Sequence, residues 1–183
     1  SKQEDYINHL QENANYLMEF IDKLLVYAEY GRLEIEQEEV DLNEVLQKSI
    51  DNLEMDIEKC RAHIHITDNL PKVQGSTISL VQMFQNLISN SMKYCSHRPE
   101  IDIHATLEDH EVTVSLMDNG IGIPKKEISK IFKPFARLEN NLDVSGTGLG
   151  LALVKNIVDQ HHGRINIVPR KEGGTQFDVI LPI

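Results

Sequence analysis

The stretch VSGTGLGLALVKN, Val144 to Asn156, decides how this sequence is interpreted, because it places three glycines before an apolar, helix-forming run. Glycine loses more conformational entropy on ordering than any other residue, so this density needs a physical reason. One reason is a tight turn before a helix. Another is the close approach of an anion to a helix N-terminus, where free N–H groups and the macrodipole attract negative charge. The G-x-G-x-G spacing matches neither the dinucleotide fingerprint nor a Walker loop, so both reasons stay open.

The composition restricts the class of protein. A chain of 183 residues with 40% hydrophobic residues has room for one good core with an appendage. Its net charge of −11 argues against nucleic acid as the main partner, and an anionic ligand would need local positive groups. No apolar run approaches the ~20 residues of a membrane span, so we expect no membrane contact within this chain. Cys60 and Cys95 form neither a disulfide framework nor a zinc pattern, which indicates a reducing, cytoplasmic location.

The first 28 residues carry a seven-residue apolar repeat. One seam position holds Ile7, Ala14, Ile21 and Ala28, and the other holds Leu10, Leu17 and Leu24. A strict heptad is typical of a coiled coil or helical bundle and favours another helix as partner. A helix packed on its own domain is the alternative. We therefore expect residues 1–32 to form a bundle helix that makes a homodimer, and residues 33–183 to form a separate domain.

The second part of the chain alternates helical and strand patterns. After a linker at residues 30–44, Asp41 with Glu44 reads as a capping box that starts a helix through Ile57. We expect a strand at residues 63–67, a loop at 68–76 and a helix at 77–94. Two hairpins are expected, one turning around Glu108–His110 and one around Lys171–Gly174. Helices grouped with hairpins predict an α+β fold, a sheet with helices covering one face.

The helix expected at residues 77–94 has two distinct faces. Its apolar stripe is Val81, Phe84, Ile88 and Met92, and its polar face is Gln82, Asn86, Asn90 and Lys93. A carboxamide oxygen can ligate Mg²⁺ without adding negative charge beside a triphosphate, and a lysine can pair with phosphate oxygens. An ordinary solvated face is the alternative for this helix taken alone.

The stretch SLMDNGIGIP, residues 115–124, places Asp118 just past a predicted strand, before Gly120 and Gly122. An aspartate there is typical of a turn, but it can also accept a hydrogen bond from an exocyclic amine such as that of adenine. The neighbouring glycines would let a flat base lie against the backbone. The lysine-rich stretch KKEISKIFKPFARL, residues 125–138, follows. Phe132 and Phe135 could anchor this stretch as a mobile flap that supplies positive charge.

Four stretches in this order resemble the N, G1, F and G2 boxes of sensor histidine kinases. They are NLISNSMKY (86–94), DNGIGIP (118–124), IFKPFARL (131–138) and GTGLGLALVK (146–155). The resemblance covers about Gln37 to Ile183, and the first helix resembles the second helix of the dimerisation and phosphotransfer bundle. It implies the GHKL (Bergerat) fold: a two-layer α/β sandwich with a mixed, mostly antiparallel sheet and about three helices, with ATP under a flexible lid. The stretch KLLVYAEYGR (23–32) also resembles phytochrome-type light-sensing kinases.

The resemblance also implies roles for individual residues. Asn90 would ligate Mg²⁺, Lys93 and Tyr94 would contact phosphate or ribose, and Asp118 would bind the adenine amine. Arg137 would reach the γ-phosphate from the lid, so the candidate catalytic residues are Asn86, Lys93 and Arg137. The other expected nucleotide contacts are Gly120, Gly122, Ile123, Phe132, Gly146, Thr147, Gly148, Leu149 and Gly150. The glycines of the opening stretch would then let the triphosphate meet a helix N-terminus.

The implied activity is transfer of the ATP γ-phosphoryl group to a histidine, for relay to the receiver domain of a response regulator. We expect the acceptor outside this chain, because His9 lacks the neighbouring acid that would take its proton. An ATPase of the gyrase, chaperone or mismatch-repair branch is the first alternative. Those enzymes place a glutamate base where this chain has Asn86, and a carboxamide cannot take a proton. A degenerate module that only dimerises or scaffolds is the second.

Two further features of the sequence involve histidines. His162 stands where the family usually has glycine, so it must adopt a left-handed or irregular conformation. His63 and His65 share one face of a predicted strand. With a third ligand they could bind a metal, but we interpret them as exposed strand residues.

Overall fold

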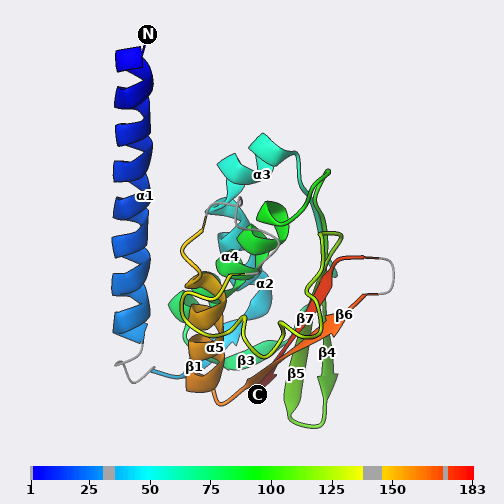
Figure 1. Cartoon of the computed structure of the whole chain (residues 1–183). Coiled ribbons are helices and arrows are strands. Elements are labelled where there is room, and N and C mark those ends of the chain that lie inside the picture. Colours follow the sequence, from blue (N-terminus) through cyan, green and yellow to red (C-terminus); the bar gives the residue numbers. More distant parts are fainter. Residues whose placement is uncertain (1, 31–35, 138–145, 171–172) are drawn as a thin grey trace. The chain divides into compact units, whose positions relative to one another are not determined.

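The computed structural model describes residues 2–30, 36–137, 146–170 and 173–183, and it divides the chain into two compact units, Ser1–Leu33 and Glu34–Ile183 (Figure 1). The first unit is the helix α1, Lys2–Tyr30. Leu10 and Leu17 of the predicted seam are exposed on it, as are Ile7, Ile21 and Leu24. Residues 31 and 32 of the predicted bundle helix lie outside the described residues. The helix is thus confirmed, whereas its role in dimerisation stays a prediction.

The second unit combines four helices with seven strands in its described part. The helices are α2 (Leu42–Asp51), α3 (Glu54–Cys60), α4 (Thr77–Lys93) and α5 (Gly150–Gln160). The strands are β1 (Glu38–Asp41), β2 (His63–Ile66), β3 (Lys72–Gly75), β4 (Glu100–Glu108), β5 (Glu111–Asp118), β6 (Arg164–Pro169) and β7 (Thr175–Pro182).

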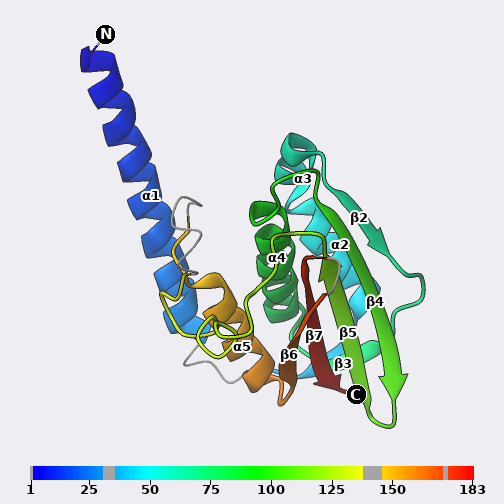
Figure 2. The ribbon, with the colours of Figure 1, turned by 45° about the vertical axis from the view of Figure 1, so that its right-hand side comes forward.

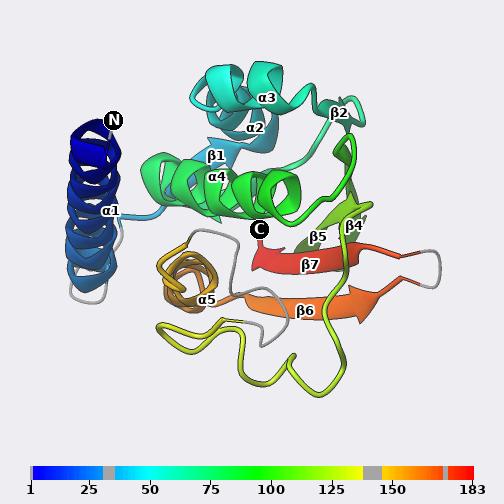
Figure 3. The ribbon, with the colours of Figure 1, turned by 45° about the horizontal axis from the view of Figure 1, so that its top comes forward.

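Five of the strands form one sheet in the order β2-β4-β5-β7-β6. Only the β2–β4 pair in this sheet is parallel, and both predicted hairpins, β4–β5 and β6–β7, are present. The helices α2, α4 and α5 lie on one face of the sheet (Figures 2 and 3). The predicted α+β sandwich with a mixed, mostly antiparallel sheet is therefore confirmed.

The core lies between the sheet and α4. Along β4, Ile101 and Ile103 are buried while Asp102 between them is exposed, as expected for a strand with one covered face. Phe84 and Leu87 of α4 are fully buried. Each such side chain stabilises the fold by roughly 1.5–3 kcal/mol relative to an exposed one. This core holds the polar face of α4 in a fixed position.

The helix α4 is buried over a wider arc than its predicted stripe, because it also packs against α2 and α5. Phe84, Ile88 and Met92 are buried as predicted, but Val81 is only half-buried. The additional buried residues are Ser79, Leu80, Met83, Leu87 and Ser91.

Two short strands lie where the sequence indicated a linker and a loop. β1 and β3 pair antiparallel, with Val40 opposite Val73. Each contributes one deeply buried valine, so neither has the repeated alternation that identifies a strand in a sequence. Their pairing joins segments about thirty residues apart, so a local sequence pattern cannot predict it.

The helix predicted after Asp41 is divided into α2 and α3. Asp41 caps α2 by accepting the backbone N–H of Asn43 at 2.8 Å, and this hydrogen bond together with that from the Asn43 side chain lowers the Asp41 pKa. Glu44 is the second residue of the predicted capping box, and its carboxylate Oε2 lies 3.8 Å from Lys48 Nζ. The break follows Asp51, where Leu53 N–H donates to Ile50 O at 2.9 Å in a tighter turn.

Candidate nucleotide site

The carboxylate of Asp118 is the most buried charged group predicted for the site. It stands at the end of β5 and is 5% exposed. Its Oδ1 accepts the backbone N–H of Gly120 at 2.9 Å and that of Thr175 at 3.0 Å. Its Oδ2 accepts the Ser91 hydroxyl at 3.3 Å. Because a carboxylate offers about four lone-pair positions, Oδ2 keeps capacity for a further donor.

Burial sets the protonation behaviour of Asp118. Desolvation raises the pKa of this carboxyl above its ordinary value, while the hydrogen bonds from Gly120, Thr175 and Ser91 and the charge of Arg170 oppose the rise. The three hydrogen bonds therefore favour the ionised form against the cost of burial. An ionised, fixed and buried carboxylate is a strong and directional acceptor.

The glycine loop after β5 is fastened to the end of α4. Ile121 N–H donates to Tyr94 O at 3.0 Å. A side chain at Gly120 would come within 2.8 Å of the same carbonyl oxygen, so only glycine allows this approach. Gly122 has φ +75° and lies against Gly174 O, while Ile123 is half-buried. The bond from Ile121 to Tyr94 places the predicted adenine loop beside the C-terminal end of α4.

The polar face of α4 meets the start of α5. A side-chain carbon at Gly150 would lie 3.0 Å from Asn86 Oδ1 and 3.7 Å from Asn90 Nδ2. Asn86 is held by its own amide, which donates to Gln82 O at 2.8 Å. The absence of a side chain at Gly150 thus allows the N-terminus of α5 to approach the two carboxamides closely. The structure thus places Asn90, the predicted magnesium ligand, close to the last glycine of the glycine stretch.

The other end of the glycine stretch lies beside Lys93. A side-chain carbon at Gly146 would come within 2.7 Å of Lys93 Nζ and 3.9 Å of the Tyr94 hydroxyl. Among the described residues, no side chain caps the start of α5, and the N-terminus of a helix attracts anions through its first N–H groups. Thr147 and Leu149 are buried. Positive charge, a helix N-terminus and two carboxamides therefore converge on one place.

The lid residues are only partly described. Phe135 N–H donates to Gly148 O at 2.9 Å, and both residues have positive φ, 65° and 71° respectively. This bond joins the F-box stretch to the glycine stretch. Phe132 is half-buried and Arg137 is exposed. Residues 138–145 of the predicted lid lie outside the described residues.

Sequence reasoning missed several residues that shape the site. Ser91, Thr175 and Arg170 all hydrogen-bond Asp118, the last through Nη1 to the main-chain oxygen at 2.7 Å. Asn119 joins the end of β5 to the segment after α4 by accepting Glu100 N–H at 2.9 Å. A buried serine next to the predicted metal asparagine was the one available signal. The other contacts join segments that are distant in sequence.

The family model described as histidine kinase-, DNA gyrase B- and HSP90-like ATPase matches residues 75–183. The chain belongs to this family. The predicted sensor histidine kinase type of GHKL domain is supported by its relatives. It is 32% identical to the phytochrome-like protein Cph1 of Synechocystis sp. over 98% of this chain and 24% of that protein. It is 27% identical to the alginate biosynthesis sensor protein KinB of Pseudomonas aeruginosa over 100% of this chain and 31% of that protein.

Solved structures of other members agree with this family assignment. The catalytic domain of histidine kinase ThkA has a TM-score of 0.70 at 29% identity, covering 80% of this chain and 97% of that one. ThkA in complex with the response regulator protein TrrA has a TM-score of 0.76 at 26% identity, covering 97% of this chain and 50% of that one. The chain spans about a quarter to a third of the length of the two sensor proteins named above.

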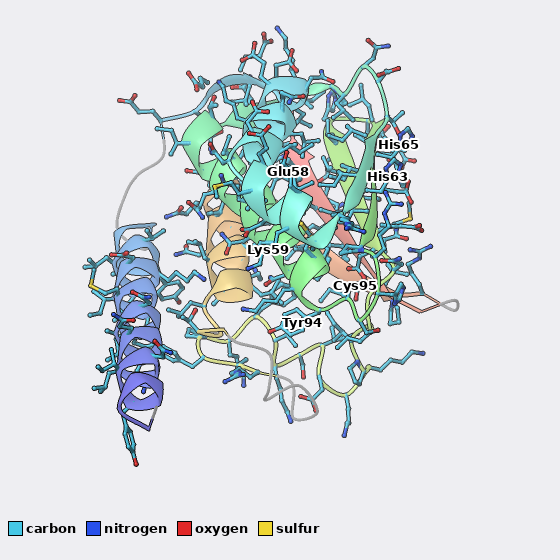
Figure 4. The ribbon with its side chains drawn as sticks, turned by 90° about the horizontal axis from the view of Figure 1, so that it is seen from above. Glu58, Lys59, His63, His65, Tyr94 and Cys95 are labelled. Atoms are coloured by element: carbon cyan, nitrogen blue, oxygen red, sulfur yellow. The ribbon has the colours of Figure 1, made fainter. Side chains whose placement is uncertain are left out.

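The three histidines considered in the sequence analysis of this domain, His63, His65 and His162, are exposed. His162 has φ 55°, the left-handed conformation that the sequence predicted. His63 and His65 are exposed along β2, whereas Tyr94 and Cys95 lie at the end of α4 (Figure 4).

The described residues contain no cluster of three metal-ligating side chains of the His, Cys, Asp or Glu type. Within the same residues, no helix is long and apolar enough to cross a membrane.

Proposed function

We propose that this chain is the ATP-binding catalytic region of a histidine protein kinase, which transfers the γ-phosphoryl group of ATP to a histidine. The observation that carries the proposal is the meeting of Asn86 and Asn90 with Gly150 at the N-terminus of α5. It brings two neutral carboxamides to the N-terminus of α5, while Lys93 lies beside Gly146 of the same glycine stretch. In this proposal residues 33–183 are the catalytic domain and residues 1–32 belong to the dimerisation and phosphotransfer domain.

Adenine recognition is assigned to Asp118. Its Oδ2 would accept the exocyclic amine, because Oδ1 already receives two backbone N–H groups. Guanine has a carbonyl oxygen at the corresponding position, and that oxygen would face the carboxylate without a proton between them. The buried acceptor therefore favours adenine over guanine. Gly120, Gly122, Ile123 and Phe132 would line the base and sugar.

The phosphates are assigned to the space in front of α5. Asn90 stands at the N-terminus of α5, with its amide nitrogen 3.7 Å from the position of a side-chain carbon at Gly150, and its carboxamide oxygen is a neutral donor of the kind that fits a hydrated Mg²⁺. Bound there, Mg²⁺ would neutralise phosphate charge. Lys93 and Tyr94 would contact phosphate or ribose from α4. Gly146, Thr147, Gly148 and Leu149 would present their backbone to the phosphates, and Arg137 would approach the γ-phosphate from the lid.

Transfer to histidine is favoured over hydrolysis by the chemistry of Asn86. Its amide nitrogen is engaged with Gln82 O, and its oxygen faces Gly150. A carboxamide holds no proton-accepting group of useful basicity, so it cannot activate water as the glutamate of the other ATPase branches would. The catalytic residues of this chain would instead position the nucleotide and offset its charge.

The proposed partners follow from the family. The exposed seam of α1 would pair with a second copy of the chain, and a response regulator receiver domain would take the phosphoryl group. The complex of histidine kinase ThkA with response regulator TrrA supports the second partner. We place the acceptor histidine outside this chain, because His9 lacks the neighbouring acid that would take its proton. The two free cysteines fit a cytoplasmic location.

Calorimetric titration of the chain with ATP and GTP, with Mg²⁺ and with EDTA, tests this function. We expect ATP to bind, GTP to bind at least tenfold more weakly (an order-of-magnitude expectation for a buried, mispaired polar group), and ATP hydrolysis to be slow. With the full-length protein, acid-labile phosphohistidine should form. Absence of ATP binding would reject the proposal, and rapid hydrolysis without phosphohistidine would favour the ATPase branch.

A further inference from the structure

The end of β5 departs from the regular ladder at Asp118. The β5–β7 register runs from Glu111 opposite Pro182 to Met117 opposite Gln176. One further pair would set Asp118 opposite Thr175. The N–H of Thr175 goes instead to the carboxylate Oδ1 of Asp118, at 3.0 Å. The Thr175 N–H therefore binds the side chain of Asp118 at the end of β5.

The main-chain oxygen of Asp118 receives its donor from Arg170. The guanidinium Nη1 donates to this oxygen at 2.7 Å, from a half-buried side chain just after β6. The chain also passes very close here, because a side chain at Gly174 would come within 1.9 Å of the same oxygen. Gly174 has φ +83°, so glycine is required on both grounds. A buried carbonyl without a donor would be costly, and Arg170 removes that cost.

We propose that Arg170 is a positioning residue for adenine recognition: by taking over the main-chain oxygen of Asp118, it lets the Thr175 N–H hold the Asp118 carboxylate toward the base. This inference rests on the proposed function, because it assigns a role within the same site. Arg170 acts through Asp118 and Thr175 and needs no contact with the nucleotide. Arg170, just after β6, thereby contributes to adenine recognition through Asp118.

The charges around Asp118 support the same role. α4 faces it with the Ser91 hydroxyl, β7 with the Thr175 backbone and the glycine loop with Gly120. Among the described residues, Arg170 is the charged group that lowers the Asp118 pKa. Arg170 therefore holds the strand end and also favours the ionised carboxylate.

The test compares Arg170→Gln and Arg170→Lys with a matched control, Arg164→Gln. Arg164 is the first residue of β6, the strand that Arg170 follows, and it forms two hydrogen bonds with Glu111, at 2.5 and 2.7 Å. Both glutamine variants lose one positive charge, so a general charge effect would appear equally in both. The pKa of Asp118 is measured in the nucleotide-free chain by carbon-13 NMR, and ATP affinity by calorimetry between pH 5 and pH 8.

We expect Arg170→Gln to raise the Asp118 pKa further, since burial already raises it and an opposing positive charge has been removed. ATP should bind about tenfold more weakly at pH 7, as for a lost charge-assisted hydrogen bond. The acidic limit of binding should move to higher pH, and Arg170→Lys should recover part of both effects. Arg164→Gln should match the parent.

Two results would overturn the role of Arg170. One is an Asp118 pKa and an ATP affinity in Arg170→Gln equal to those of Arg164→Gln. The other is a lower melting temperature with an unchanged Asp118 pKa, which would indicate a purely structural contact. Failure of the parent chain to bind ATP would reject the proposed function instead, and the NMR titration would still decide whether Arg170 controls Asp118.

Discussion

Replacement of Asp118 by asparagine separates adenine recognition from folding, because the structure shows how a carboxamide would fit. Its oxygen can take the place of Oδ1 and keep the N–H donors of Gly120 and Thr175. Its amide would then face the Ser91 hydroxyl, which already lies 3.1 Å from Leu87 O as a donor. That hydroxyl can donate to Leu87 and accept from the new amide. We therefore expect Asp118→Asn to fold.

The pKa of Asp118 sets the pH dependence of this comparison. Burial raises that pKa in the folded chain above its ordinary value of 3.8. Protonation of the carboxyl therefore stabilises the folded parent chain relative to its unfolded state. This contribution to the free energy of unfolding is lost as the pH rises from 3.8 through the higher pKa of the folded state. The asparagine variant does not titrate there. Its free energy of unfolding relative to the parent should thus increase between about pH 4 and pH 7.

Binding should change in the opposite direction. The introduced amide would point a donor at the adenine amine, so a buried pair of donors would replace a charge-assisted hydrogen bond. This costs about 1.5–3 kcal/mol, or roughly 10- to 150-fold in ATP affinity. Calorimetry with Mg-ATP at pH 7 and urea unfolding from pH 4 to pH 7 measure the two effects separately.

Asp178→Asn is a suitable control. Asp178 lies on β7 in the same sheet and accepts from Ser115 at 2.6 Å and Gln176 at 2.8 Å. Its replacement should leave ATP affinity within about twofold, which is under 0.5 kcal/mol. If Asp118→Asn also binds ATP within twofold of the parent, Asp118 does not recognise adenine. If the variant fails to fold, the predicted rearrangement of the Ser91 hydrogen bond is wrong.

Three other changes probe different parts of the chain. Asn90→Asp should weaken ATP binding more with Mg²⁺ than with EDTA, since its carboxylate repels the triphosphate; equal calorimetric affinity with Mg²⁺ would exclude Asn90. Burial lowers the His161 pKa, and the neutral ring joins Ile157 O at 2.7 Å to Ser76 N at 3.0 Å. As the pH falls below 6.5, the histidine is protonated in the unfolded chain before it is protonated in the folded one. The free energy of unfolding, measured with urea, should therefore fall by at most about 1.4 kcal/mol per pH unit. A pH-independent difference in this free energy between the parent and His161→Gln would contradict the prediction. Leu17→Glu, at a position 57% exposed on α1, should reduce self-association in sedimentation velocity and leave ATP affinity unchanged; a monomeric parent at high concentration would refute this.

The sequence by itself determined the elements whose signals are local. The heptad predicted α1, alternating residues predicted β4 and β5, and the apolar spacing predicted α4. The ordered motifs pointed to the ATPase family, because glycines, carboxamides and an aspartate stand at fixed spacings within short stretches. Such patterns are visible because the period of a helix or strand repeats along a single segment.

The tertiary structure decided what depends on contacts between distant segments. β1 and β3 pair with each other across about thirty residues of chain, which no local pattern records. The environment of Asp118 is built by Ser91, Thr175 and Arg170, which lie 27, 57 and 52 residues away along the chain. A hydrogen bond fixes atoms in space but leaves no period in the sequence. The motifs could therefore name the aspartate, whereas only the folded chain brings together the groups that bury it, orient it and keep it ionised.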